Sequence, residues 1–428
     1  MDPSLKTGQT RTRRLYDNFP YNKEFDSFVV SSFPGKKEKT LDVILDATLF
    51  FPEEGGQTPD QGTLNGFPVV DVQTSKDEVI THTISLEHSS SPLKDNTSLF
   101  AQGSSVHGIL DWNYRFSNMQ NHTGEHIVSG LLHTLYGYEN VGFRLSDHTV
   151  TLDTSGILTK EQVLDLERRA NEVVWNNVPV TCEYPDPFIL STLQYRCKKE
   201  LKGAIRIVTI EGIDVCACCA PHVRHTGEIG LIKFLSAVHF GKNTTRITLV
   251  SGRRALSKMQ EYQSELEESS HLLNMPREET SNGIQRLKEE LVSQKERNTQ
   301  TEIKLIEARV SQILVLYPDP SQRSSQDIFL FEEGLSSLSL RSLMNELCDM
   351  GWRYAGVFCK TRTSEKANIE PLEEQWTYYI GSRKNDARIP NALLLDQLHA
   401  RGGGKKDMVQ GSVHGPEETI RAVLKKIE

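Results

Sequence analysis

Two histidines and a glutamate lie close together in the segment NHTGEH, residues 121–126, and have the chemistry to bind and use a metal ion. On a helix, His122 and His126 project from the same face, about 6 Å apart along the axis. That spacing allows two imidazoles to share one zinc ion. With Glu125 between them, the segment matches His-x-x-Glu-His, a signature of zinc peptidases in which the glutamate is the general base.

A second group of ligand-type residues occurs in the segment CACCAPHVRH, residues 216–225. Cys218 and His222 have the same four-residue spacing, so a thiolate and an imidazole could complete a His-His-Cys-His set. Pro221 argues against a helix interior here but permits a tight loop. A local zinc finger is the alternative, but zinc fingers place about a dozen residues between their cysteine and histidine pairs. The spacing is too short for that alternative, whose ligands would be Cys216, Cys219, His222 and His225.

The elements around the first histidine pair predict how the pair is presented. Helical periodicity begins with SNMQ at residues 117–120, which has the form of a capping box. Ile127, Leu131 and Leu135 then mark one apolar stripe. By helical spacing the two histidines lie opposite this stripe, so we expect them to face a groove rather than the core. His133 lies too far along the axis to join the site.

The composition indicates a globular protein with a metal site rather than a disulfide-stapled one. The chain has 428 residues, of which 37% are hydrophobic and 25% charged, and this length allows two or three domains. The crowding of three of the seven cysteines at residues 216–219 suits metal binding in a reducing compartment. The apolar runs are far shorter than a membrane span, and the N-terminal residues lack a secretory pattern. We therefore expect a cytoplasmic protein without a membrane partner.

The net charge of −8 does not favour nucleic-acid binding by the chain as a whole. Any nucleic acid must therefore meet local basic patches, for which a solvated charged surface is the alternative interpretation. One candidate patch lies at residues 196–206 and the other at residues 401–406. Their members are Arg196, Lys198, Lys199, Lys202 and Arg206, and then Arg401, Lys405 and Lys406.

The order of elements predicts an α+β protein. Between residues 41 and 110, short β-rich runs separated by turn residues indicate a small β-barrel or sandwich. In the next region, strands at 148–154 and 204–210 flank a helix within 160–177. Apolar spacing over residues 254–312 predicts a helical hairpin or short coiled coil, which Pro276 and Gly283 interrupt.

After residue 313 strands and helices alternate again, and they enclose a predicted loop, RGGGKKD, at residues 401–407. We therefore predict four domains. They are a β-barrel-like N-terminal domain at residues 1–112, a metal-binding α+β domain at 113–250, a helical linker or coiled coil at 251–312, and a C-terminal α/β domain at 313–428.

Several motifs together resemble the editing domain of alanyl-tRNA synthetases and of the free-standing alanyl-tRNA editing proteins of the AlaX type. That family pairs His-x-x-x-His with Cys-x-x-x-His, followed by Thr-Gly-Glu-Ile-Gly, which occurs here at residues 226–230. Its Phe-Tyr-Pro-Glu-Gly-Gly-Gly-Gln element resembles residues 50–57, where Phe51 replaces the tyrosine and Glu54 the first glycine. The segment at 402–411 is similar to the C-terminal domain that these synthetases share with DHH-type phosphoesterases. The 428 residues include no class II aminoacylation domain, so the chain resembles the long free-standing form.

The resemblance implies a zinc-dependent trans-editing hydrolase. Its substrate and partner would be alanine tRNA charged with a wrong amino acid, chiefly serine and secondarily glycine, whose ester bond is cleaved at the zinc site. One zinc ion per chain would be held by the residues that match the family's ligands, His122, His126, Cys218 and His222.

Further candidate site residues follow from their positions beside these motifs. Glu125 is a candidate general base, or else a polar partner of a ligand histidine. Gln57 is a candidate catalytic residue, and with Thr58 it could contact the amino acid or the terminal adenosine. Asn140 and Asp153 are candidate substrate contacts in the segment after the histidine helix. Phosphate contacts would come from the C-terminal patch of Arg401, Lys405 and Lys406.

Two alternatives belong to other function classes. A His-x-x-Glu-His peptidase would leave Cys218, His222 and the C-terminal Gly-rich segment unexplained. A non-catalytic tRNA-binding or phosphoesterase-like protein would rest on the C-terminal domain alone, and the Asp-His-His motif of the DHH enzymes is absent from the sequence. A homodimer formed through the helical linker or the C-terminal domain is the remaining candidate partner.

Overall fold

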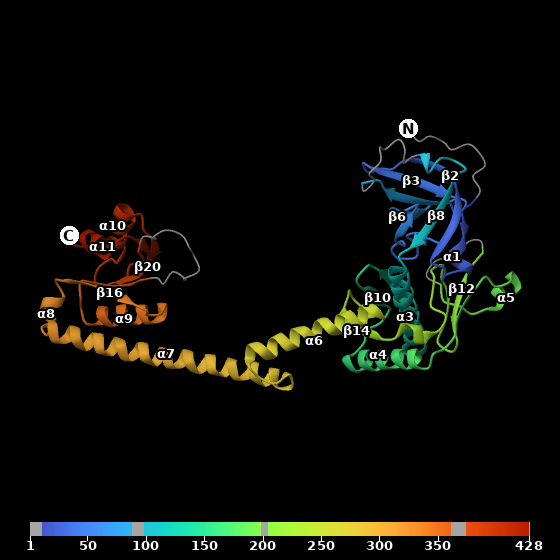
Figure 1. The fold of residues 1–428 in the computed structure, drawn as a ribbon. Coiled ribbons are helices and arrows are strands. Elements are labelled where there is room, and N and C mark those ends of the chain that lie inside the picture. Colours follow the sequence, from blue (N-terminus) through green and yellow to red (C-terminus); the bar gives the residue numbers. More distant parts are fainter. Residues whose placement is uncertain (1–10, 88–97, 198–203, 361–373, 428) are drawn as a thin grey trace. The chain divides into compact units, whose positions relative to one another are not determined.

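The computed structural model describes residues 11–87, 98–197, 204–360 and 374–427, which confirm the α+β class (Figure 1). The chain divides into two compact units, Met1–Glu268 and Ser269–Glu428. The boundary lies inside helix α6 (Arg253–Leu273). The finer division into four domains stays a prediction. In the described part of the chain, no helix combines the length and apolar character needed to cross a membrane.

Unit 1 begins with a closed β-barrel, which confirms the predicted small barrel. Alternate side chains of its first strand are buried, namely Phe25, Ser27 and Val29. This strand precedes the β-rich runs that the sequence indicated at residues 41–110, so it was missed as an element of the barrel. Ser27 is an inward residue whose hydroxyl donates to the Ala47 carbonyl at 2.7 Å, so the apolar alternation is broken. In order around the barrel the strands are β2 (Glu24–Pro34), β3 (Thr40–Leu45), β7 (Ile80–Ser85), β6 (Phe67–Thr74), β5 (Gly62–Leu64) and β8 (Ser105–Leu110).

Helix α3 (Trp112–Tyr136) follows the barrel directly and carries the NHTGEH segment. Its N-cap is Asp111, whose carboxylate accepts a hydrogen bond from the Tyr114 backbone N–H at 3.0 Å. The helix ends at Gly137, which has the left-handed φ of 66°. The predicted start at residues 117–120 is therefore wrong, because Ser117 lies inside the helix and is buried.

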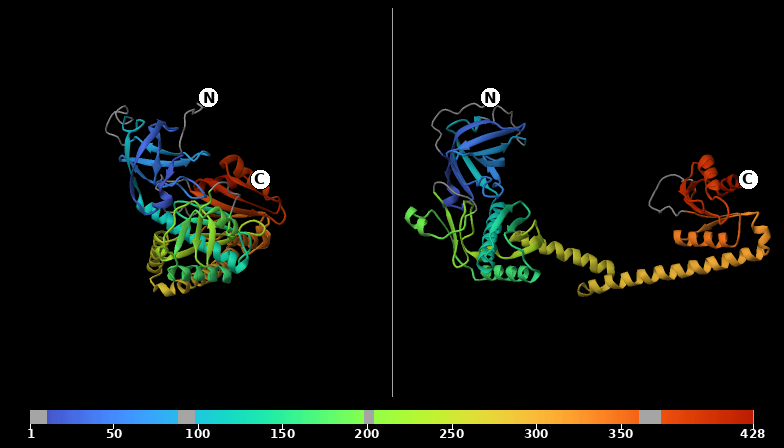
Figure 2. Two further views of the ribbon diagram at one scale, coloured as in Figure 1. Left: turned by 90° about the vertical axis from the view of Figure 1, so that its right-hand side faces the viewer. Right: turned by 180° about the vertical axis from the view of Figure 1, so that it is seen from behind.

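Two antiparallel sheets flank α3 in the rest of unit 1 (Figure 1, Figure 2). Helix α3 contacts strands of both sheets. The predicted strands and the predicted helix of this region are present. The larger sheet has the order β14 (Ile232–His239), β15 (Thr245–Ser251), β10 (Val150–Thr154) and β9 (Asn140–Leu145), and the smaller has β11 (Val180–Glu183), β12 (Ile207–Ile210) and β13 (Asp214–Ala217).

A second long helix, α4 (Lys160–Trp175), packs against α3 and β14. It starts at a complete capping box formed by Thr159 and Gln162. With both sheets, α4 and the barrel around it, α3 has almost no exposed residue between Arg115 and Leu132. Short elements complete the unit: β1 (Arg13–Arg14), α1 (Leu15–Asn18), β4 (Ala47–Thr48), α5 (Pro187–Thr192) and the 3₁₀ turn η1 (Thr226–Ile229).

Unit 2 joins a long helix to a five-stranded sheet. Helix α6 ends before Pro276, and α7 (Thr280–Leu316) follows a short 3₁₀ turn, η2 (Arg277–Glu279). Pro276 does interrupt the helical region as predicted, but Gly283 lies inside α7. A Cβ on Gly283 would lie 2.4 Å from the Met275 sulfur, so this glycine permits close packing of the turn. Coiled-coil pairing of these helices stays a prediction.

The sheet of unit 2 confirms the alternating order predicted for the C-terminal residues. Its strands run in the order β16 (Asp327–Glu333), β17 (Tyr354–Lys360), β18 (Gln375–Gly381), β20 (Met408–His414) and β19 (Arg401–Gly404). Only β16 and β17 pair in parallel among these described strands. The helices of the unit are α8 (Pro320–Arg323), α9 (Ser337–Asp349), α10 (Arg388–Leu398) and α11 (Glu417–Leu424).

The prediction of a loop at residues 401–407 is wrong for its first half. Arg401–Gly404 form the edge strand β19, which pairs antiparallel with β20 through a tight hairpin. Glycine has a low strand propensity, which made these residues look like a loop. Antiparallel pairing of β19 with β20, the next strand in the sequence, overrides that local preference.

Candidate metal centre

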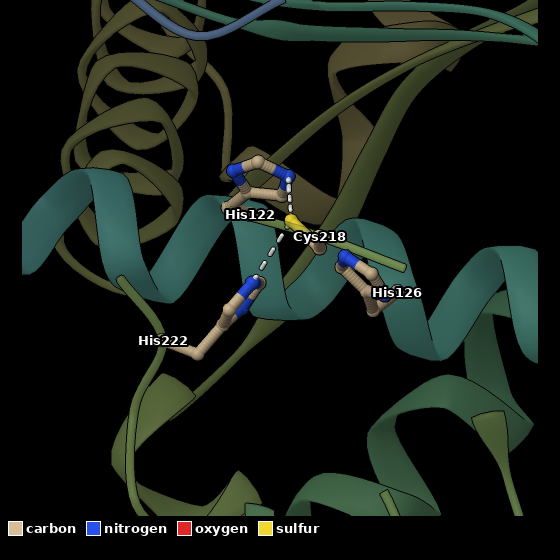
Figure 3. A group of neighbouring side chains, drawn as sticks. All are labelled: His122, His126, Cys218 and His222. Carbon is tan, nitrogen blue, oxygen red and sulfur yellow. Dashed lines mark hydrogen bonds between the residues drawn. The ribbon is translucent and has the colours of Figure 1, made fainter. Parts of the chain in front are cut away.

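Four ligand-type side chains meet inside unit 1, and they are the four expected from the sequence (Figure 3). His122 and His126 come from neighbouring turns of α3, whereas Cys218 and His222 come from the loop after β13. One ligand atom of each residue lies within 4.8 Å of every other. The Cys218 sulfur is 3.6 Å from His122 Nε2 and 3.4 Å from His222 Nε2. Ligand atoms of a tetrahedral zinc site lie about 3.3–3.8 Å apart, so these two distances to the sulfur fit such a metal.

The centre lies in the interior rather than in the groove that the apolar stripe predicted. His122 and His126 are each 3% exposed, and His222 is 2% exposed. The Phe143 ring covers His122 at 4.8 Å between ring centres. The prediction failed because it placed the core on one side of α3 only, whereas strands and helices surround this helix. Leu135, on the predicted buried stripe, is instead 38% exposed.

Each histidine has an acceptor at the ring nitrogen that points away from the centre. His122 Nδ1 lies 2.7 Å from the Gln57 amide oxygen, and His126 Nδ1 lies 2.8 Å from an Asp214 carboxylate oxygen. His222 Nδ1 lies 3.0 Å from the Thr123 hydroxyl oxygen, which itself donates to the Met119 carbonyl. These acceptors assign the proton of each ring to Nδ1. The three Nε2 atoms face the Cys218 sulfur, and in the neutral rings they are unprotonated, as metal ligation requires.

The three crowded cysteines differ in their tendency to ionise. Burial acts to raise the pKa of Cys218, but the neighbouring imidazoles of His122 and His222 outweigh it and hold that pKa well below its usual range. Burial raises the pKa of Cys216 to about 11. Burial, the charge of Cys218 and the nearby Glu54 raise the pKa of Cys219 well above its usual range. Cys218 is thus the one of the three that favours the thiolate form, which is the form that binds metals.

Asp214 and Cys216 form a second group with His126 that has ligand-type spacing. Both oxygens of Asp214 are already engaged, because Arg196 donates to them at 2.7 and 2.9 Å. Cys216 favours the neutral thiol, as its raised pKa indicates. This second group therefore fits a support for His126 better than a separate metal site. His225, a member of the zinc-finger alternative, is half exposed and pairs with Glu228 at 4.0 Å.

The loop that carries Cys218 and His222 is held by Arg206. This side chain is 5% exposed and donates to the carbonyls of Cys218 at 3.0 Å and Ala220 at 2.8 Å. Arg206 and Arg196 are members of the first candidate patch, for which phosphate contacts and a solvated charged surface were the two interpretations, and neither interpretation fits these two side chains. Both guanidinium groups are used inside the protein. The other patch members, Lys198, Lys199 and Lys202, lie outside the described residues.

Glu125 and Asn140 are neighbours, although the sequence separates them. Glu125 is 1% exposed, and its Oε1 accepts hydrogen bonds from the Ser129 hydroxyl and the Asn140 amide. The Asn140 oxygen in turn accepts from the Gly142 backbone N–H at 3.1 Å. This arrangement fits a carboxylate that is held in place beside the ligand histidines.

Gln57 lies in the Gly-rich turn that joins the barrel to the centre. The turn has left-handed φ angles of 63° at Gly55 and 85° at Gly56, a conformation that favours glycine. A Cβ on Gly56 would lie 2.8 Å from the Phe143 carbonyl oxygen, so the turn packs directly on β9. Thr58, next in the chain, lies 2.9 Å from the Tyr114 hydroxyl.

The remaining candidates lie apart from these contacts. Asp153, on β10, receives two hydrogen bonds of 2.7 Å from Arg246. His133, which the sequence excluded from the site, is exposed and pairs with Glu139 at 2.7 Å. The three basic candidates of the C-terminal patch, Arg401, Lys405 and Lys406, belong to unit 2 and are exposed.

Asp214 and Thr123 each contact a ligand histidine, but neither residue was predicted from the sequence. Asp214, Cys216 and Cys218 alternate along the chain, so an extended strand places them on one side. That alternation was an available signal for Asp214. Thr123 has no such signal, because its partner His222 lies in a loop whose position depends on the fold.

Comparison with known proteins relates the centre to tRNA synthetases. The family model of the threonyl and alanyl tRNA synthetase second additional domain matches residues 205–248, which include Cys218 and His222. An alanyl-tRNA editing protein AlaX-L of Pyrococcus horikoshii is 28% identical over 422 residues, 97% of this chain and 98% of the relative. An alanyl-tRNA editing protein Aarsd1 of Danio rerio is 31% identical over 424 residues, 95% of each chain. An alanine–tRNA ligase of Methanococcus maripaludis is 30% identical over 436 residues, 99% of this chain but 44% of the ligase.

We expect the purified protein to contain one zinc ion per chain and to lose it when Cys218 is changed to alanine. The variants C216A and C219A are matched controls and should keep the metal. The pKa values of the Cys216 and Cys219 thiols are raised, whereas the pKa of the Cys218 thiol is lowered. Metal analysis after dialysis gives the result. Zinc that remains in C218A but disappears in C216A or C219A would show that the ligand assignment is wrong.

Proposed function

Since the chain belongs to the family of alanyl-tRNA editing proteins, we propose that it hydrolyses the ester between a wrong amino acid and alanine tRNA. The proposed substrates are alanine tRNA charged with serine and, secondarily, alanine tRNA charged with glycine. One observation carries the proposal: His122, His126, Cys218 and His222 converge in a chain that matches these relatives along nearly its whole length.

The proposed cofactor is zinc, held by the four converging side chains. Three unprotonated imidazole nitrogens and a thiolate are the donor set that zinc prefers. When bound there, zinc would supply Lewis-acid polarisation of the ester carbonyl or of a water. The protein's own part is to hold the donors at the right spacing and to exclude competing solvent, which the burial of His122, His126 and His222 supports.

Glu125 is the proposed general base for the attacking water. Its carboxylate follows His122 by three residues on the same helix and is fixed by Ser129 and Asn140. Such fixing reduces the entropy lost when a proton is accepted in a defined direction. In this scheme Asn140 positions Glu125, and Gln57 positions His122 instead of contacting the substrate. Thr58 and Asp153 stay proposed contacts for the amino acid or the terminal adenosine.

The peptidase alternative has less support. It uses the pattern of His122, Glu125 and His126 but gives no role to Cys218 and His222, which lie in the same cluster. The relatives that match nearly the whole chain are named alanyl-tRNA editing protein or alanine–tRNA ligase. No contact among the described residues favours peptide over aminoacyl ester as substrate.

The proposal is tested by incubating the purified protein with three substrates. We expect rapid deacylation of serine-charged alanine tRNA, slow or no deacylation of alanine-charged tRNA, and no cleavage of an unstructured polypeptide. The C218A variant serves as the control for dependence on the centre. Cleavage of the polypeptide with both tRNAs left intact would replace this function with the peptidase alternative.

Replacement of Glu125 by glutamine should slow deacylation by roughly 10²-fold or more, because the amide cannot accept the proton of water. Zinc content should stay at the wild-type value, since Glu125 is not among the converging ligands. The same change at the exposed Glu139 is a matched control and should leave the rate unaltered. Near-normal turnover of E125Q would reduce Glu125 to a structural or specificity role.

The C-terminal unit is proposed to supply tRNA affinity through β19 and its turn. Gly402 and Gly404 are glycines for packing reasons, because a Cβ would lie 2.4 Å from the Tyr378 hydroxyl or 2.2 Å from the Met408 carbonyl oxygen. A Cβ on Gly403 would meet no atom within 4 Å. The fold therefore does not require glycine at Gly403, and close approach of a phosphate is a reason for it. Arg401, Lys405 and Lys406 would supply the positive charge.

The triple variant R401A/K405A/K406A should raise the Michaelis constant for charged tRNA and leave the rate at saturation unchanged. The salt dependence of tRNA binding should fall by about one unit of logarithmic slope for each phosphate that is no longer neutralised. A matched control removes three exposed lysines of α7, Lys288, Lys295 and Lys304. Equal effects in both triple variants would mean that overall charge, rather than β19 and its turn, determines tRNA affinity.

A further inference from the structure

The three ligand histidines are supported by acceptors of different charge. Gln57 offers His122 a neutral amide oxygen, and Thr123 offers His222 a neutral hydroxyl oxygen. That hydroxyl oxygen also accepts from the Val223 backbone N–H at 3.3 Å, so it is shared. His126 alone among these three receives a carboxylate, that of Asp214.

The Asp214 carboxylate is kept in place by a two-point ion pair. Arg196 Nε donates to one oxygen at 2.7 Å, and Arg196 Nη2 donates to the other at 2.9 Å. The Asp214 side chain is 1% exposed and the Arg196 side chain 13% exposed. Little solvent therefore competes with the pair, and a bidentate arginine fixes the plane of the carboxylate.

Arg196 is itself held in place by backbone hydrogen bonds to β13. Arg196 runs beside β13, with its N–H donating to the Val215 carbonyl at 2.8 Å and its carbonyl accepting from Ala217 at 3.0 Å. At the start of β13, Gly130 of α3 has no room for a Cβ, which would lie 2.3 Å from the Ile213 carbonyl oxygen. Helix α3 and the start of β13 are therefore pressed together where His126 meets Asp214.

We propose that Asp214 and Arg196 are positioning residues that make His126 the most strongly held ligand of the metal centre. An ionised acceptor increases the electron density that an imidazole offers a metal more than a neutral acceptor does. His222, whose acceptor is a shared neutral hydroxyl, is correspondingly the most weakly held of the three and the one that yields to substrate or water. This inference rests on the proposed zinc centre.

The alternative role for Asp214 is direct metal ligation together with His126 and Cys216. Both oxygens of Asp214 are engaged, so direct ligation would require Asp214 to lose a hydrogen bond with Arg196 or His126. The two roles differ in what they demand of Cys216. A ligand group needs its thiolate, whereas a positioning role does not involve its sulfur.

The test is the zinc dissociation constant of the intact protein, measured by competition with a chromogenic chelator. We expect D214N to bind zinc about 10–100-fold more weakly, as is typical when a ligand histidine is deprived of its partner. T123V should be weakened less than D214N, and C216S should keep the wild-type value. The matched control D327N breaks a similar bidentate pair with Arg353 in unit 2 and should also keep it.

The role of Arg196 can be tested by chemical rescue. Arg196 and Asp214 line an open pocket of about 560 Å³, so a small cation can reach the carboxylate when the side chain is removed. R196A should bind zinc more weakly than wild type, and millimolar guanidinium should restore part of the affinity, whereas sodium at the same concentration should not. Wild-type affinity in R196A would overturn the proposal.

Other outcomes separate this inference from the proposed function. Wild-type zinc affinity in D214N, or weaker zinc binding in T123V than in D214N, would overturn the ranking of ligands while editing activity stands. Weakened zinc binding in D214N, with no deacylation by the wild-type protein, would support the ranking and remove the function.

If D214N fails to fold, ¹⁵N-labelled histidine in the wild-type zinc protein gives the answer by NMR. We expect His126 to carry its proton on Nδ1, with that proton shifted downfield of those on His122 and His222. A proton on Nε2 of His126 would overturn the proposal.

Discussion

A buried ion pair between Arg115 and Asp60 attaches the barrel to helix α3, and the geometry of the metal centre depends on that attachment. Arg115 is fully buried and donates to both Asp60 oxygens, and also to the carbonyls of Leu49 and Pro20. Asp60 in turn accepts from the Phe51 N–H at 2.6 Å. Loss of one partner of such a pair leaves an unpaired buried charge, which costs about 3–5 kcal/mol. The loop that contains Gln57 is thereby held against the helix that contains His122.

Helix α3 can occupy the centre of unit 1 because several of its polar side chains and its glycines are matched to their neighbours. Asn121, which is fully buried, donates to the Ser117 and Ser251 carbonyls and accepts from the Ser251 N–H. Gly124 faces Ser251, whose hydroxyl oxygen would lie 2.5 Å from an added Cβ. Larger side chains on that face would push β15 away, and buried polar groups without partners would destabilise the fold. The interior position of the ligands follows from this packing.

The sequence predicts those parts of the protein that depend on local spacing. The four-residue steps of His122 to His126 and of Cys218 to His222 are local, and so are the β-rich runs and turn residues that indicated most barrel strands. Parts that depend on distant contacts were missed or wrong. The chain enters α3 at Asp111 because a barrel strand ends there, and Arg196 is a positioning candidate rather than a phosphate contact because Asp214 lies beside it. Such partners are brought together only by the folded chain, so composition and periodicity do not reveal them.

The edge strand β19 has a consequence for the behaviour of the protein in concentrated solution. Its residues are all exposed and three of the four are glycines, so its outer backbone groups are open to pairing with a strand of another molecule. Arg401 at one end and Lys405 and Lys406 in the hairpin turn place positive charge along this edge. Two copies that approached edge to edge would repel each other, whereas a polyanion would be attracted. Resistance to aggregation and attraction of RNA would then depend on the same few charges, and selection for one property would also act on the other.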